Sequence, residues 1–334
     1  MIPLHSLRGR LTSFIHPFPF PSNSYSTLPI SSHKMDGAYQ QDIELLEKAF
    51  LMFGLAADDR EVERLIKAFL VPVTLKMNSK FKPVQDKAME LLSHITKRLQ
   101  TRSQVQLPII VLIEQLDGAT PLVQNFILVY LRIGIPRLSP VDQIEILPLL
   151  IKSMNNKTKK QIDSILSLYS GALIHLTITD AAALKSLVPP DGTMKEYYLC
   201  YQLTLLLIPY SYEGDLPPPG LTVSQYKQIV SDKPVDPDTL EKMKVATIHL
   251  LSSELFAINE MLIHLIIGSC DPRHSVYELC DQKLKHNSDY EDNGVIEKLY
   301  NIYLGTASEP YCYYLWSVNF CYFHVHHIIV HLTH

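Results

Sequence analysis

A helical spacing of apolar residues recurs along most of this chain and constrains its fold more than any other feature. In each recurrence, apolar residues stand at positions i, i+3, i+4 and i+7, and the longer sets add i+11. Residues at this spacing lie on one side of an α-helix, where they form a stripe that must be buried. The clearest sets are Val62, Leu65, Ile66, Phe69 and Val73; Ala88, Leu91, Leu92, Ile95 and Leu99; Ile162, Ile165, Leu166, Tyr169 and Leu173; and Ile296, Leu299, Tyr300 and Tyr303. No comparable stretch alternates strictly between apolar and polar residues, and glycine, which tight hairpin turns need, occurs only 12 times in 334 residues. The sequence therefore predicts an all-α protein.

Residues that favour helix starts stand before several of the periodic segments. Asp58 can cap one helix, Pro83 and Pro140 fit the first turn of two others, and the Asp-Pro pairs at 236–237 and 271–272 open two more. The predicted helices cover residues 40–54, 60–79, 83–101, 105–117, 121–133, 141–154, 160–178, 194–208, 222–231, 237–254, 257–269, 273–286 and 292–305. Taken as antiparallel pairs, they begin near residues 40, 83, 121, 160, 222 and 257. These starts have a period of roughly 40 residues with one long insertion, which resembles the HEAT or armadillo unit of roughly 40–47 residues, so we expect an α-solenoid of antiparallel helix pairs.

Composition divides the chain into three regions. Residues 1–35 contain five prolines and no acid, which suits a disordered extension, sequence upstream of a start at Met35, or an organelle transit peptide. Residues 36–310 form the predicted helical-repeat domain. Residues 311–334 are rich in aromatic residues and histidine and carry no Asp, Glu, Lys or Arg. This tail has the length of a membrane span, but its five histidines and Asn319 are costly in hydrocarbon and lack the ordered spacing of a zinc site. We interpret it as an aberrant tail, with membrane or metal binding as the alternatives.

The charge of the central region argues against nucleic acid as a partner. All 34 acids lie between Asp36 and Glu309, and three of the 30 basic residues, Arg8, Arg10 and Lys34, lie outside that segment. The segment therefore holds 27 bases against 34 acids, a net charge of −7. Because nucleic-acid binding relies on neutralising phosphates, protein partners are the expectation. The five cysteines form no C-x-x-C pair, which suits reduced thiols in an intracellular protein.

A search for catalytic and cofactor motifs finds no glycine-rich phosphate loop, H-E-x-x-H, EF-hand or G-x-S-x-G sequence. His94, His175, His249 and His264 stand alone among apolar neighbours, which favours core positions. The segment from Asp271 to Ser275 places Asp, His and Ser within five residues, but adjacent residues at a helix start point in different directions and cannot form a catalytic triad. The simpler interpretation is that Asp271 caps a helix and that Arg273 and His274 project into solvent or a neighbouring loop.

Two proline-rich segments, residues 188–192 and 214–220, interrupt the helices and are expected to be exposed loops. The second contains Pro217, Pro218 and Pro219, a run that could dock as a polyproline II helix in an aromatic groove. The more common role of such a run is that of a stiff spacer.

Several segments, in order along the chain, resemble the N-terminal domain of the proteasome adapter and scaffold protein family, whose members are large HEAT-repeat proteins. These segments are Ala68–Lys76, Lys87–His94, Gln106–Pro108, Val123–Phe126, Gly134–Leu138, Ile208–Tyr212, Pro217–Gly220, Asp271–Val276 and Lys298–Gly305. The resemblance runs from about residue 40 to 305. It implies a non-catalytic protein without cofactors, located in the cytoplasm and nucleus. It also implies that such a protein tethers the core and regulatory particles of the 26S proteasome, supports their assembly, and contacts membranes at most indirectly. Family members are several times longer, so the chain resembles an N-terminal fragment.

Two functions therefore follow from the sequence. The first is a proteasome adapter, and the alternative is a generic HEAT-repeat or transport-receptor-like binding module with a different cargo. The candidate partner-binding residues are Pro217, Pro218, Pro219, Arg273 and His274.

Overall fold

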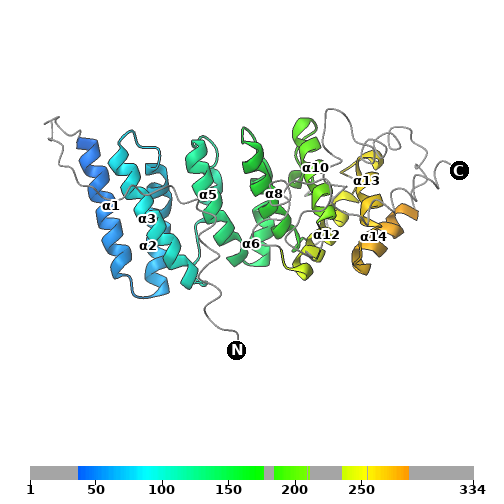
Figure 1. Cartoon of the computed structure of the whole chain (residues 1–334), viewed down its shortest axis with the longest axis horizontal. Helices are drawn as coiled ribbons and strands as arrows, with labels where there is room; N and C mark the ends of the chain where they lie inside the picture. Colours follow the sequence, from blue (N-terminus) through cyan, green and yellow to red (C-terminus); the bar gives the residue numbers. More distant parts are fainter. Residues whose placement is uncertain (1–36, 177–183, 209, 211–234, 254, 286–334) are drawn as a thin grey trace, which may run out of the picture.

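The computed structural model describes residues 37–176, 184–208, 210, 235–253 and 255–285 of the chain. Within these ranges the protein contains helices and no strands, which confirms the predicted all-α class. The elements are α1 (Gly37–Leu55), α2 (Asp59–Lys76), α3 (Lys82–Thr101), α4 (Ile109–Glu114), α5 (Pro121–Gly134), η2 (Ile135–Arg137), α6 (Pro140–Glu145), α7 (Leu147–Lys152), α8 (Lys159–Leu173), η3 (Lys185–Leu187), α10 (Thr193–Leu207), α12 (Pro237–Leu251), α13 (Ile258–Gly268) and α14 (His274–Lys285). The helices stand side by side along the long axis of the molecule and follow one another in chain order, as Figure 1 shows.

The helices form two layers. In the first layer α1, α3, α5, α8, α10 and α13 contact one another in that order. In the second layer α2 packs against α1 and α3, α4 against α5, α7 against α8, α12 against α8, and α14 against α13. The pair starts predicted near residues 40, 83, 121, 160 and 257 correspond to the first residues of α1, α3, α5, α8 and α13, whereas the start near 222 lies outside the described residues.

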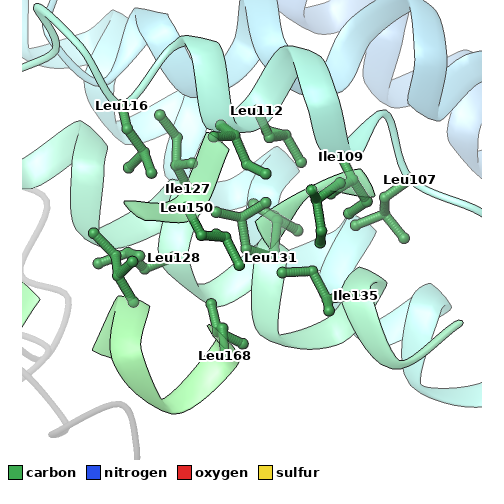
Figure 2. Packing of buried hydrophobic residues seen from close by; sticks show 14 of the residues in the cluster. Leu107, Ile109, Leu112, Leu116, Ile127, Leu128, Leu131, Ile135, Leu150 and Leu168 are labelled. Atoms are coloured by element: carbon green, nitrogen blue, oxygen red, sulfur yellow. The ribbon is translucent and has the colours of Figure 1, made fainter. Parts of the chain in front are cut away.

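The apolar stripes predicted from the sequence form the core of this arrangement. Every member of the stripe from Ala88 to Leu99 is buried on α3, and the stripe from Ile162 to Leu173 is buried on α8. Figure 2 shows how Leu112, Ile127, Leu131 and Leu150 bring α4, α5 and α7 together. α4 and α5 approach closely at Gly134, where a Cβ would lie 2.4 Å from Cδ1 of Ile109.

Arginine side chains form hydrogen bonds that join one helical repeat to the next. Arg98 at the end of α3 donates to the carbonyl of Ala56, at 2.6 Å. Arg137 in η2 donates to three carbonyls at the end of α3, those of Leu99 at 2.9 Å, Arg102 at 3.1 Å and Val105 at 2.7 Å. Each arginine therefore bonds to carbonyls at or just beyond the end of a helix in the repeat that precedes it.

Two helices differ from the prediction because proline and glycine interrupt them. The helix predicted over 105–117 is the shorter α4, which follows Pro108 and ends before Gly118, a residue with φ of 81°. The helix predicted over 141–154 is divided at Ile146 into α6 and α7. Pro148 lies in the first turn of α7 and has no N–H to donate to the preceding turn, so a continuous helix loses a hydrogen bond there.

Some predictions concern residues outside the described ranges. The helices at 222–231 and 292–305, the loop with Pro217, Pro218 and Pro219, and the flanking regions 1–35 and 311–334 all lie there.

Candidate interaction surface

Of the predicted binding residues, the structure describes Arg273 and His274, which lie at the start of α14. They stand where α14 contacts α12, beside Tyr210, which follows α10 in the chain. Residues from three parts of the sequence therefore meet here, and we call this meeting point of α12, α14 and Tyr210 the corner.

The centre of the corner is a buried ion pair that the sequence did not predict. Nζ of Lys244 on α12 lies 2.8 Å from Oδ2 of Asp271, and the two side chains are only 2% and 3% exposed. The other carboxylate oxygen, Oδ1, accepts hydrogen bonds from the Tyr210 hydroxyl at 2.9 Å and from the backbone N–H of Arg273 at 2.9 Å. The prediction that Asp271 caps a helix is therefore wrong. The helix begins three residues later, and the carboxylate faces inward because a buried ammonium requires a charged partner.

Tyr210 covers this ion pair and positions Arg273. Nζ of Lys244 lies 4.3 Å and Cζ of Arg273 lies 5.1 Å from the centroid of the Tyr210 ring. Arg273 also reaches Glu241 at 3.4 Å and Asp238 at 3.7 Å on α12. Burial raises the pKa of Tyr210, and the nearby carboxylate of Asp271 raises it further. The Tyr210 hydroxyl therefore keeps its proton and remains a donor. Arg273, with 40% of its side chain exposed, is a restrained surface residue.

The exposed face beside Arg273 carries His274, Tyr277 and Glu278. The rings of His274 and Tyr277 stack with centroids 6.3 Å apart, and Nε2 of His274 lies 3.3 Å from Oε2 of Glu278. The His274 side chain is 81% exposed, as predicted. Arginine and tyrosine are enriched among residues that dominate binding energies, and Arg273 and Tyr277 are both partly exposed on this turn.

The arrangement cannot act as a catalytic triad. Asp271 is bonded to Lys244 and Tyr210, His274 pairs with Glu278, and the Ser275 hydroxyl donates to Glu241. Each member therefore has a different partner, and no proton path joins the three.

The other histidines predicted to lie in the core differ in their surroundings. His264 is buried, and its ring nitrogens lie 3.0 Å from the carbonyl of Glu260 and 2.9 Å from that of Leu199. His94 is half-buried against Phe50, and burial lowers its pKa. His175 is half-buried as well, whereas His249 is exposed, so the core prediction is wrong there: its neighbours on α12 face the core and it does not.

Two of the three described cysteines, Cys270 and Cys280, are buried. Cys280 is fully buried, and burial raises the pKa of its thiol to about 12, while Cys270 is buried and its pKa is raised by the same cause. Cys200 is half-buried. Among the residues that the structure describes, no group of three or more His, Cys, Asp or Glu side chains is placed to hold a metal ion. No helix in these ranges combines the length and apolar character needed to cross a membrane.

Comparison with known proteins identifies the family. The sequence model described as "Proteasome component ECM29, N-terminal" matches residues 46–314, which is most of the chain. The chain belongs to the ECM29 family. It is 32% identical over 302 residues to the human "Proteasome adapter and scaffold protein ECM29", a match that covers 80% of this chain. It is 29% identical over 287 residues to the "Proteasome-associated protein ECM29 homolog" of Drosophila melanogaster, covering 82% of this chain. The matched parts are 16% and 15% of those two relatives, so the chain spans about a sixth of their length.

Two of the segments on which the ECM29 resemblance rests contact each other at this corner. They are Ile208–Tyr212 and Asp271–Val276, and the contacts join Tyr210 to Asp271 and Arg273. Lys244 was missed, although the sequence contains a signal: it follows Met243 within an apolar helical stripe, where a charge needs a buried partner. The segment Asp271–Val276 therefore supplies one member of the buried ion pair, Asp271, and the exposed residue His274.

Proposed function

We propose that this chain is part of a non-catalytic adapter that binds the 26S proteasome and that its helical row supplies some of the binding surface. The observation that carries the proposal is the match of residues 46–314 to the ECM29 N-terminal family. The relatives from human and fly are named as proteasome-associated or as a proteasome adapter and scaffold.

The shape of the molecule supports an adapter role on physical grounds. A row of stacked helices presents an extended surface, and binding to it can be distributed over many side chains. Such a surface suits a partner as large as the core or regulatory particle. We propose that both particles are partners, that membrane contact is at most indirect, that no nucleic acid or cofactor is involved, and that the protein works in the cytoplasm and nucleus.

Affinity purification tests this function. The full tagged chain is expressed in cells, and the bound proteins are quantified by mass spectrometry. Subunits of both proteasome particles are expected to dominate the bound fraction. If they do not exceed a tag-only control, the adapter function is rejected, and enrichment of another cargo would favour the transport-receptor-like module expected as the alternative.

A pair of variants tests whether the turn at the start of α14 takes part. His274→Ala combined with Tyr277→Ala removes two stacked, exposed rings and leaves the Lys244–Asp271 ion pair in place. Arg64→Ala, on the exposed face of α2 at the other end of the row, is the control. We expect the first variant to lower proteasome recovery and the second to leave it unchanged. Equal recovery from both variants would exclude this turn from the interface.

A further inference from the structure

Helix α5 carries two apolar stripes, and one of them faces outward. The first stripe, with Val123, Ile127 and Leu131, is buried in the core. The second stripe has the spacing i, i+4, i+7 and i+11, and we call it the outer stripe; it consists of Leu122, Phe126, Val129 and Ile133. Leu122 and Val129 are 47% and 46% exposed, and the other two residues are half-buried. Because the outward side of a surface helix is normally polar, this stripe indicates that a further element covers α5.

The neighbouring helix α3 widens this apolar face. The Tyr130 hydroxyl of α5 donates to the carbonyl of Leu92 on α3 at 3.0 Å, and Arg137, which follows α5, bonds to carbonyls at the end of α3. The two helices therefore run in the same direction, side by side in the row (Figure 1). Met89 lies one turn before Leu92, and Phe126 lies one turn before Tyr130, so the two side chains stand at the same level. Met89 is 39% exposed and joins the outer stripe in one apolar face.

The dimensions of the face fit an α-helix. Between Leu122 and Ile133 the outer stripe extends about 17 Å along the axis of α5, which is about three helical turns. Side chains at the spacing i, i+4 form ridges that pack between the equivalent ridges of another helix. A partner helix of about three turns can therefore cover the stripe along its whole length, in the mode by which amphipathic helices bind apolar surfaces.

The charges around the face select the chemistry of that helix. Lys97 of α3 and Arg132 of α5 flank the end of the stripe near Ile133, and both are exposed. At the opposite end the exposed acids of α3, Asp86 and Glu90, are each paired with a lysine of the same helix. One end of the face is therefore positive and the other is close to neutral. Acidic residues are favoured in the first turn of a helix, so a helix with an acidic first turn at the positive end complements these charges.

We propose that the outer stripe and Met89 form a docking site for one amphipathic helix of a protein partner. The partner helix lies antiparallel to α5, buries its apolar side chains against the face, and places the acids of its first turn beside Lys97 and Arg132. This inference goes beyond the proposed function, because the site accepts such a helix whichever protein supplies it. The site lies in the middle of the described row, away from the turn at the start of α14 (Figure 1).

Peptide binding to the full chain tests the site. The probe is a fluorescent synthetic helix of about 16 residues with Glu in its first turn and Leu at the spacing i, i+4, i+7 and i+11. Fluorescence anisotropy is expected to show saturable binding. A peptide with the same residues in an order that destroys the apolar face should bind at least about tenfold more weakly. Equal binding of the two peptides, or no saturable binding of the probe, would overturn the proposal.

Two double variants locate the bound peptide. Leu122→Glu with Val129→Glu should lower the affinity at least about tenfold, because the peptide would bury the new carboxylates without partners. Leu51→Glu with Leu55→Glu is the matched control, since these leucines of α1 are 65% and 82% exposed but lie at the end of the row. The control should leave the affinity unchanged. If both double variants weaken binding alike, the peptide adheres to any exposed apolar residue and the proposal is wrong.

A charge exchange tests the orientation of the helix. Lys97→Glu should weaken the probe by about two- to fivefold and strengthen a peptide with Lys in its first turn by a similar factor. This variant leaves every apolar residue in place, so it decides the matter even if Leu122→Glu with Val129→Glu does not fold. Unchanged affinities for both peptides would exclude the proposed orientation. Sedimentation of the natural chain tests the other occupant: a dimer that Leu122→Glu with Val129→Glu dissociates would show that a second copy covers the face, contrary to the proposal.

Discussion

The Lys244–Asp271 ion pair makes a quantitative prediction about stability. Asp271→Ala removes the carboxylate and leaves the Lys244 ammonium group buried, at 2% exposure, without its counter-charge. The same substitution takes away the acceptor of the Tyr210 hydroxyl and of the Arg273 N–H. Breaking a buried pair by removing one partner costs about 3–5 kcal/mol. Tyr210 and Arg273 are only half-buried and can reach water, so the loss of their acceptor adds little to this cost. We therefore expect Asp271→Ala to lower the free energy of unfolding by about 4 kcal/mol.

A second variant separates the charge from the packing. Lys244→Met with Asp271→Asn removes both charges and keeps an amide oxygen to accept from Tyr210 and Arg273. Replacing both members of a buried pair is often close to neutral, so this variant should stay within about 1 kcal/mol of the natural chain. Lys244→Met alone, which leaves the carboxylate buried, should fall between the two.

Urea unfolding followed by circular dichroism measures these differences, and hydrogen exchange in α12 and α14 shows where they arise. A total stability of about 5–15 kcal/mol is usual for a folded domain, so a loss of 4 kcal/mol is easily resolved. If Asp271→Ala and the double variant lose the same free energy, the charge pair contributes nothing and our account of the corner is incorrect.

Three further predictions concern other parts of the row. Arg137→Ala removes three hydrogen bonds to carbonyls at or just after the end of α3 and should lower the free energy of unfolding by about 2–3 kcal/mol in a urea titration. An unchanged unfolding midpoint would show that water replaces the guanidinium as the donor to these carbonyls. Gly268→Ala places a Cβ 2.4 Å from Sγ of Cys280 and should lower the free energy of unfolding by about 1–3 kcal/mol in the same assay. Adding Cys280→Ala should restore part of this stability, and strictly additive losses from the two substitutions would contradict the steric account. Burial lowers the pKa of His94, so the folded state binds fewer protons than the unfolded state and stability should fall as the pH drops below 6.5 towards that lowered pKa. His94→Gln should reduce this loss in thermal unfolding scans between pH 7 and pH 5, and a pH profile identical to that of the natural chain would refute the prediction.

Local patterns predicted most of this fold because each helix buries a stripe that its own sequence defines. The sets around Leu91 and Leu166 lie on α3 and α8 as expected. The break between α6 and α7 was missed because the apolar spacing continues across Ile146, and only Pro148, which can equally stand in a first turn, marks the boundary.

The candidate surface was harder to predict because its contacts join distant parts of the chain. Asp271 follows a turn and precedes a helix, which resembles a capping position, and its true partner Lys244 lies 27 residues earlier. Tyr210 reaches the same carboxylate across 61 residues. Periodicity within one helix carries no information about which helices meet, so the predicted exposure of His274 was confirmed while the role of Asp271 was wrong.

The central claim is that this helical row itself binds the proteasome, and a native-gel experiment with purified components tests it most directly. The full chain, checked for helical content by circular dichroism, is titrated into purified 26S proteasome, and the migration of the particle is followed by a peptidase stain. We predict that the chain comigrates with the doubly and singly capped particles and that binding saturates. A folded chain that never comigrates with either form, at any concentration tested, would contradict the claim.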